Sequence, residues 1–260
     1  TSTSNAQVKE LAKLQKKSRL RDEKGIFLVE GPRMTEEIPA ERIEKVYASE
    51  SFAKKNKEFS EKLQAPVELL TDTVFAYVSD TKTPQGILLV MEQRSCEICE
   101  MLDLDAQGRK PLLMVLDNLQ DPGNLGTILR AGEAAGITGV IMDSQTADIY
   151  NPKVIRSTMG SIYRMPFLYV EDVVSLEKKL KEKGIRSFAA HLKGENSYDH
   201  ESYKGGTAFF IGNEGKGLTD QAADAADCLI RIPMCGKVES LNAAMASGIL
   251  MYEAARQRRE

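Results

Sequence analysis

Three short segments of the sequence place polar side chains at the edges of apolar runs, where the surrounding structure can hold them rigidly. They read NLGTILR at 124–130, FIGNEGKGL at 210–218 and IPMCGKVESLN at 232–242. A guanidinium is a poor base, but it can orient a polar group and stabilise negative charge that develops on it. Amide, carboxylate and hydroxyl groups can hold such a group in place. The polar candidate residues in these segments are Asn124, Arg130, Glu214, Ser240 and Asn242.

The glycine-rich stretches differ from the standard nucleotide-binding loops. Residues 117–126 form the turn after the first strand of the second half, and they lack the GxGxxG spacing of a dinucleotide-binding fold. The run from Gly212 to Gly217 has a lysine four places after Gly212, but no Ser or Thr follows that lysine. It therefore fails the P-loop pattern as well.

Apolar runs and helical periodicity alternate from Pro111 onward, which predicts a mostly parallel sheet with helices on both faces. Asp121 and Pro122 form a cap and first-turn pair for a helix that runs to Ala135. The other expected helices are 151–159, 173–183 and 240–256. The expected strands are 112–116, 139–142, 167–170, 185–190, 207–211 and 228–230.

Two helix starts affect the candidate residues. Asn124 and Arg130 are six places apart, which corresponds to about 600° around a helix. They cannot share one face if both are helical, so we expect Asn124 in the entry loop or cap. Ser240 could act as the N-cap of the last helix, as a functional hydroxyl, or as both.

The first part of the chain predicts a smaller α/β domain. Strands are expected at 25–30, 43–48, 67–70 and 86–91, and helices around 8–14, 51–63 and 73–78. The segment from 94 to 110 has a mixed polar composition that suits a linker better than a core element. We therefore expect domains at 1–95 and 111–260, joined by a linker at 96–110.

The composition restricts the class of protein. Hydrophobic residues make up 42% of the chain and charged residues 28%, as in an ordinary soluble globular protein. No apolar run approaches the roughly 20 residues of a membrane span, and the first residues lack the pattern of a secretory signal. These features predict a cytoplasmic protein. A net charge of −3 argues against a general polyanion binder, although the first 24 residues are rich in lysine and arginine.

The cysteines do not indicate a metal site. Cys96 and Cys99 have the spacing of a metal or redox pair, but no second close pair exists. The two histidines, His191 and His200, are far from both in sequence. We therefore expect free thiols and no bound metal.

In their order and spacing, the three segments resemble the motifs of the SpoU/TrmH family of RNA ribose methyltransferases. The resemblance implies a catalytic domain with a trefoil knot, S-adenosylmethionine as cofactor, and a homodimer formed through the C-terminal domain. It also implies that Arg130 orients the ribose 2′-hydroxyl and stabilises the developing alkoxide, helped by the other four candidates. The residues that it implies for cofactor binding are Gly212, Ile232, Met234 and Leu241.

The segment 25–33, which reads GIFLVEGPR, is similar to the L30e-like substrate-binding domain found in many of these enzymes. Enzymes with this domain mostly act on ribosomal RNA. The residues expected to contact RNA are Lys13, Lys16, Lys17, Arg19, Arg21 and Arg33.

We therefore expect an RNA 2′-O-ribose methyltransferase that acts on large-subunit ribosomal RNA. A tRNA ribose methyltransferase and a non-catalytic RNA- or ribosome-binding protein on the same scaffold remain as alternatives.

Overall fold

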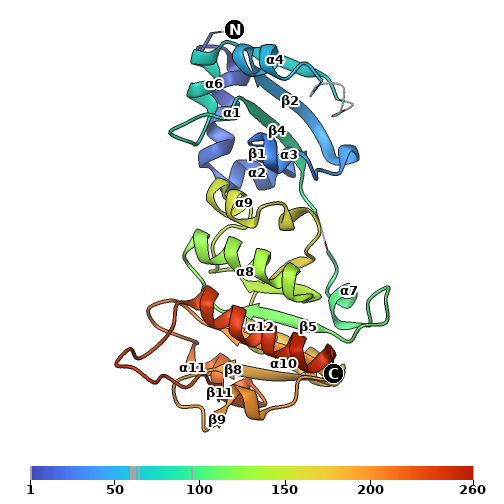
Figure 1. Cartoon of the computed structure of the whole chain (residues 1–260), viewed down its shortest axis with the longest axis vertical. Helices are drawn as coiled ribbons and strands as arrows, with labels where there is room; N and C mark the ends of the chain where they lie inside the picture. Colours follow the sequence, from blue (N-terminus) through green and yellow to red (C-terminus); the bar gives the residue numbers. More distant parts are fainter. Residues whose placement is uncertain (1, 59–62, 64, 95, 260) are drawn as a thin grey trace. The chain divides into compact units, whose positions relative to one another are not determined.

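The computed structural model describes residues 2–58, 63, 65–94 and 96–259. The chain forms two compact units (Figure 1). The first contains Thr1–Arg94 and Asp148–Tyr163, and the second contains Ser95–Ala147 and Arg164–Glu260. The chain therefore passes from one unit to the other after residues 94, 147 and 163. Within the described residues, no helix combines the length and the apolar character that a membrane span requires.

The first unit is built on a four-stranded mixed sheet in the order β1-β4-β2-β3. Strand β4 pairs antiparallel with β1 and β2, and β3 pairs parallel with β2. The four strands are β1 (Ile26–Glu30), β2 (Ile43–Ser49), β3 (Val67–Leu70) and β4 (Ile87–Glu92).

Helices α1 (Ala6–Lys16) and α6 (Asp72–Val78) pack on this sheet. Val8, Leu11 and Leu14 recur at a spacing of three, so they form one apolar face of α1 that is buried against the strands. The shorter elements of this unit are α2 (Ser18–Lys24), α3 (Pro32–Thr35), η1 (Ala40–Arg42) and α4 (Glu50–Lys55).

The helix predicted over 51–63 is shorter in the structure. α4 ends at Lys55 because Asn56 leaves the helical region, with φ of −126°. The Asn56 side chain donates a hydrogen bond to the carbonyl of Phe52 at 2.9 Å, which closes the last turn. Residues 59–62 and 64 of the predicted segment and its flank lie outside the described residues.

Residues 148–163 belong to the first unit although they lie between two strands of the second. They contain α9 (Pro152–Thr158) and η2 (Ser161–Tyr163). The Tyr150 ring packs on Phe27 of β1 with centroids 4.7 Å apart, and the Tyr163 hydroxyl donates to the Met34 carbonyl at 2.9 Å. These contacts make the segment part of the core of the unit.

The second unit is built on a seven-stranded sheet in the order β7-β6-β5-β10-β8-β11-β9, and every neighbouring pair is parallel. This confirms the predicted parallel α/β fold. The six predicted strands are present, and the short β9 was not expected. The strands are β5 (Leu112–Leu116), β6 (Gly139–Asp143), β7 (Phe167–Val170), β8 (Ile185–Ala190), β9 (Asn196–Ser197), β10 (Gly206–Ile211) and β11 (Cys228–Arg231).

Helices cover both faces of this sheet. Figure 1 shows α8 (Pro122–Ala135) and α12 (Ala243–Arg259) side by side on one face. On the other face, α7 (Ile98–Leu102), α10 (Val173–Glu182) and α11 (Asp220–Ala225) share a core with Leu113 and Val115 of β5. η3 (Tyr198–His200) follows β9.

The segment expected to be a linker at 96–110 contains α7. Met101 and Leu102 of this helix are buried in the core of the second unit, as is Cys96. The polar residues around them hid these apolar positions in the sequence.

Candidate active site

The pair β5 and β10 marks the point where the chain changes direction across the sheet. The connection that leaves β5 leads to β6 on one side, and the connection that leaves β10 leads through α11 to β11 on the other. In parallel sheets, a crevice for ligands opens beyond the carboxyl ends of the strands at such a point. Residues 117–121 and 212–219 follow these two strands directly. The motif segments 124–130 and 210–218 therefore lie beside this crevice.

Hydrogen bonds join all three motif segments here. The Glu214 carboxylate accepts from the backbone N–H groups of Gln120 at 3.1 Å and Asp121 at 2.9 Å, and from the Asn124 side-chain amide at 3.0 Å. The Asn124 carbonyl oxygen accepts from the side-chain amide of Asn242 at 2.9 Å. Three of the five predicted catalytic residues therefore form one continuous cluster, Glu214–Asn124–Asn242.

The prediction that Asn124 precedes the helix is wrong. Asp121 is the N-cap, and its side chain accepts from the Asn124 backbone N–H at 2.8 Å. Pro122 starts the helix because its fixed φ suits the first helical position, so Asn124 is the third residue of α8. Side chains of a helix lean toward its N-terminus, which directs the Asn124 amide back to Glu214.

The last helix also begins later than expected. Asn242 is the residue that caps α12, since its side-chain oxygen accepts from the N–H groups of Ala244 at 2.9 Å and Met245 at 3.2 Å. Ser240 therefore does not cap this helix. Its side chain is exposed and makes no hydrogen bond with any residue in the described ranges.

Arg130 lies outside the cluster. It is six residues after Asn124 on α8, or about 9 Å along the helix axis. Its side chain is exposed and forms no ion pair or hydrogen bond within the described part of the chain. The guanidinium is thus open to a partner from outside this chain.

The surroundings of Glu214 keep it ionised. Partial burial by itself would raise the pKa of Glu214, but the bonds donated by Asn124, Asp121 and Gln120 outweigh burial, and the pKa lies below its ordinary value of 4.5. The carboxylate also lies beside the first turn of α8, where the helix dipole favours negative charge. Glu214 is therefore a fixed acceptor that organises the site and not an acid that supplies a proton.

Gly212 is required by the turn that follows β10. Asn213 and Gly217 exchange two backbone hydrogen bonds of 3.0 and 2.9 Å, which close a tight hairpin. A Cβ atom on Gly212 would lie only 2.1 Å from the backbone nitrogen of Leu218. Gly212 is therefore needed because the backbone of Gly217 and Leu218 passes close to it, and this turn forms one wall of the crevice.

Three further polar residues, Asp117, Asn118 and Thr219, stabilise the crevice and were not singled out in the sequence. Asp117, only 3% exposed, accepts from the N–H and the hydroxyl of Thr219, both at 2.8 Å. Asn118 adopts a left-handed φ of 59°, and its carbonyl accepts from the Asn213 side chain at 2.9 Å. The signal was two polar residues directly after a fully apolar strand, where a ligand crevice is expected.

The third motif segment supplies unpaired backbone. Between β11 and α12, residues 233–241 make no hydrogen bond or ion pair with any residue that the structure describes. Ile232, Met234 and Leu241 of this region are partly buried. Apolar side chains beside open N–H and C=O groups fit an adenine ring, which has apolar faces and hydrogen-bonding edges.

The residues expected to contact RNA divide into two groups. Arg21 is 3% exposed; it forms an ion pair with Asp148 and donates to the carbonyls of Leu14 and Gln15. It is therefore occupied inside the first unit and is not presented to RNA. The exposed residues are Lys13, Lys16, Lys17, Arg19 and Arg33.

No metal centre is visible in the part of the chain that the structure describes, since no group of three or more His, Cys, Asp or Glu residues is arranged to hold an ion. The buried Cys96 thiol donates to the carboxylate of Glu100 at 3.1 Å.

The chain matches known proteins over nearly its whole length. It is 33% identical over 254 residues to the 23S rRNA (guanosine(2553)-2′-O)-methyltransferase RlmP of Bacillus subtilis (strain 168), and the match covers 96% of each protein. An AdoMet-bound rRNA methyltransferase from Sinorhizobium meliloti is 28% identical, with 98% and 96% covered and a TM-score of 0.82.

A solved RNA 2′-O ribose methyltransferase is 29% identical to the chain. The match covers 100% of this chain and 98% of that one, with a TM-score of 0.83. Residues 5–89 match the MRM3-like substrate binding domain, and residues 111–252 match the SpoU rRNA Methylase family. Together with the parallel fold and the three joined motif segments, these matches show that the chain belongs to the SpoU rRNA methylase family.

Proposed function

We propose that this protein transfers a methyl group from S-adenosylmethionine to the ribose 2′-hydroxyl of a guanosine in large-subunit ribosomal RNA. The observation that carries this proposal is the cluster Glu214–Asn124–Asn242, which joins the three motif segments at the crevice beyond β5 and β10. The name of the Bacillus subtilis relative describes the same reaction, and the similarity extends over both units.

Residues of the second and third motif segments bind the cofactor in this proposal. Bound S-adenosylmethionine supplies an electrophilic methyl group on a sulfonium centre. Ile232, Met234 and Leu241 contact the adenosine, and the unpaired backbone of residues 233–241 bonds its polar edges. Gly212 holds the hairpin that forms the facing wall.

The polar residues act on the acceptor nucleotide. Arg130 orients the ribose hydroxyl and stabilises the negative charge that develops on its oxygen. Ser240, whose hydroxyl is open, donates a further hydrogen bond. Glu214 and Asn242 hold the two ends of the Asn124 amide, so this cluster keeps the motif segments in register. As the new O–C bond forms and the S–C bond breaks, S-adenosylhomocysteine leaves and the hydroxyl proton passes to solvent. Positioning of the hydroxyl for in-line attack supplies much of the rate acceleration.

The proposal includes a homodimer through the C-terminal domain. On α12, Met245 is 62% exposed and lies three residues before Gly248. A Cβ atom on Gly248 would meet nothing within 4 Å, so its own chain does not require a glycine there. A second copy packed on this face gives both residues a role and brings another chain toward Arg130. Light scattering tests this, and a mass of one chain would contradict it.

The first unit is proposed to recruit RNA. Its exposed cations are suited to phosphate contacts, which position an RNA without reading its sequence. They are Lys13, Lys16, Lys17, Arg19 and Arg33. The first domain at 1–95 is completed by residues 148–163, and the rest of 111–260 forms the catalytic domain. The trefoil knot of the family and a cytoplasmic location complete the proposal.

Two alternatives are distinct from this function. A tRNA ribose methyltransferase is disfavoured by the match of residues 5–89 to a substrate-binding domain, since the tRNA enzymes of the family usually lack it. A non-catalytic RNA-binding protein is disfavoured by the joined motif segments, which have no evident role without a cofactor.

Transfer of tritiated methyl from S-adenosylmethionine tests the function. Unmodified 23S rRNA and tRNA are compared as acceptors for the wild-type protein, Arg130→Ala and Lys179→Ala, a control that removes an exposed cation from α10. We expect label in 23S rRNA in an alkali-resistant dinucleotide, a loss of at least about 100-fold for Arg130→Ala, and no loss for the control. Label in tRNA alone would mean that tRNA, and not 23S rRNA, is the substrate. Absence of label in both RNAs together with absence of cofactor binding would exclude methyltransferase activity.

A further inference from the structure

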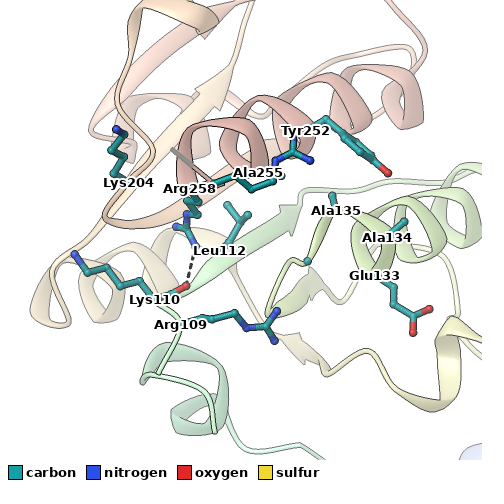
Figure 2. Close-up of a pocket in the computed structure, with 12 residues that line it drawn as sticks. Arg109, Lys110, Leu112, Glu133, Ala134, Ala135, Lys204, Tyr252, Ala255 and Arg258 are labelled. Atoms are coloured by element: carbon teal, nitrogen blue, oxygen red, sulfur yellow. Dashed lines mark hydrogen bonds between the residues drawn. The ribbon is translucent and has the colours of Figure 1, made fainter. Parts of the chain in front are cut away.

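A basic cleft lies at the end of the second unit's sheet opposite to the candidate active site. It has a volume of about 450 Å³ and is bounded by the last turns of α8 and α12 and by the residue that begins β5 (Figure 2). Five cations and a single carboxylate are among the residues that line it. They are Arg109, Lys110, Lys204, Arg258, Arg259 and Glu133.

Arg258 organises this cleft. Its guanidinium donates to the carbonyls of Lys110 at 2.8 Å and Pro111 at 2.9 Å, which lead into β5. It also donates to the carbonyls of Tyr203 at 2.9 Å and Gly205 at 2.5 Å, which lead into β10. Figure 2 shows Arg258 between the two segments that carry Lys110 and Lys204. One partly buried side chain therefore fixes the backbone that presents both lysines.

Most of the positive charge in the cleft is not neutralised, since only Arg109 of the five cations has an ion-pair partner among the described residues. Burial lowers the pKa of Arg258, and no carboxylate among the described residues offsets this effect. Glu133 is already paired with Arg164, and Arg109 with Asp105. Lys110, Lys204 and Arg259 are exposed and form no ion pair within the described residues.

The excess of cations is local. The whole chain has a net charge of −3, so a basic composition does not explain it. Lysines without a carboxylate partner act as mobile point charges, which suit phosphate groups on a polymer better than one fixed ligand. Tyr252, 49% exposed, lines the same cleft and offers an aromatic face to a base.

We propose that this cleft binds the phosphodiester backbone of the RNA substrate at a distance from the site of methyl transfer, through Lys110, Lys204 and Arg259. The inference rests on the proposed function, because it takes the RNA substrate as the occupant. Contacts of this kind add affinity and fix orientation, and they carry no sequence information. Arg258 is a positioning residue, since its donors are used by the protein itself.

The test is the salt dependence of RNA binding. Lys110→Ala/Lys204→Ala is compared with Lys178→Ala/Lys179→Ala, which removes two exposed lysines from α10 outside the cleft. Affinity for an unmodified 23S rRNA fragment is measured by fluorescence anisotropy over a range of KCl concentrations. We expect the cleft variant to reduce the slope of log K against log [KCl] by about 2, one for each lysine, and the control to keep the wild-type slope. In methyl transfer, the loss should appear in the KM for RNA.

Two results would overturn the inference. One is a cleft variant with wild-type affinity and slope. The other is a cleft variant whose molar mass in solution differs from that of the wild type, because the cleft would then be a contact between copies of the chain. RNA binding is measured without the methyl donor, so absence of methyl transfer by the wild type would count against the proposed function alone.

Discussion

The two ends of the β5–β10 pair are held by opposite charges. Where the strands end, the carboxylates of Asp117 and Glu214 accept hydrogen bonds from backbone N–H groups of the following loops. Where the strands begin, the guanidinium of Arg258 donates to four backbone carbonyls of the preceding segments. At each end, a side chain of the required charge satisfies backbone groups that the sheet and helices leave unpaired.

The difference between the ends lies in what remains unused. At the carboxyl end, the carboxylates of Asp117 and Glu214 are occupied by the protein, and the open groups include backbone atoms of residues 233–241 and the neutral hydroxyl of Ser240. At the amino end, the cations outnumber the bonds that the fold needs, and Lys110, Lys204 and Arg259 are left over. The first arrangement suits a small cofactor with polar edges, and the second suits a polyanion.

The largest difference between the two ends of the strand pair should appear when a glycine on either side of β10 is replaced by alanine. Gly212→Ala places a Cβ atom 2.1 Å from the Leu218 nitrogen and 2.3 Å from the Gly217 carbonyl oxygen. The backbone must move, so we expect a loss of about 3 kcal/mol in unfolding free energy and loss of cofactor binding. Urea unfolding and calorimetric titration with S-adenosylmethionine measure both.

Gly205→Ala is the control for this comparison. A Cβ atom on Gly205 would meet nothing within 4 Å, so stability and cofactor binding should stay at the wild-type level. If the two variants were equally stable, the hairpin after β10 would accommodate the extra Cβ atom at little cost. The carboxyl end of the strand pair would then not be rigid.

Removal of the cation at the amino end should have a smaller effect. Arg258→Ala leaves four carbonyls without their donor, but two of these bonds are exposed and water can replace them. We expect a loss of about 2 kcal/mol in unfolding free energy, with unchanged affinity for S-adenosylmethionine. Arg258→Lys keeps the charge but not the planar set of donors, so its stability should lie between those of Arg258→Ala and the wild type. A loss of cofactor affinity in Arg258→Ala would mean that the two ends are coupled.

The smallest expected change in stability concerns Glu177, a carboxylate that, unlike Glu214, accepts no hydrogen bond from a backbone N–H group of the described residues. Glu177 on α10 is buried; one oxygen accepts from the Ser187 hydroxyl at 2.7 Å, and the other has no partner among the described residues. Burial, with a further contribution from Asp227, raises the pKa of Glu177 above 4.5, so the folded state binds this proton more tightly than the unfolded chain.

The pH dependence follows from these directions. The contribution of Glu177 to stability is complete below pH 4.5 and is lost as the pH rises through its pKa in the folded state. Glu177→Gln should therefore be more stable than the wild type at pH 8, and the difference should shrink toward pH 4. For Glu214→Gln the sign is reversed, because the pKa of Glu214 is lowered: the wild type should be more stable at pH 8 and lose this advantage on acidification. Thermal unfolding from pH 4 to 8 measures both, and parallel curves for the two variants would contradict the assignment.

Local patterns in the sequence predicted much of the fold. The runs at 112–116 and 185–190 are strands with the expected bounds, and α8 starts at Pro122 as the Asp–Pro pair predicts. Such signals depend on residues within a few places of one another. The partners of the site do not, since Glu214 bonds to Gln120 over 94 positions, and Arg258 to Lys110 over 148.

The misplacement of Arg21 has the same origin. In the sequence it belongs to a run of cations that favours an RNA contact, but its carboxylate partner Asp148 is 127 residues away. Nothing near Arg21 indicates burial, and only the tertiary fold brings the two together.

The segment 148–163 also has a consequence for how such proteins are assembled and exchanged. A gene fragment that ends near residue 95 would encode a first unit without Tyr150 and Tyr163, and Phe27 would lose the aromatic ring that covers it. The complementary fragment would carry the same sixteen residues without the surface on which they fold. No single cut in this chain yields two complete modules, so transfer of the first unit to another enzyme requires two separate insertions.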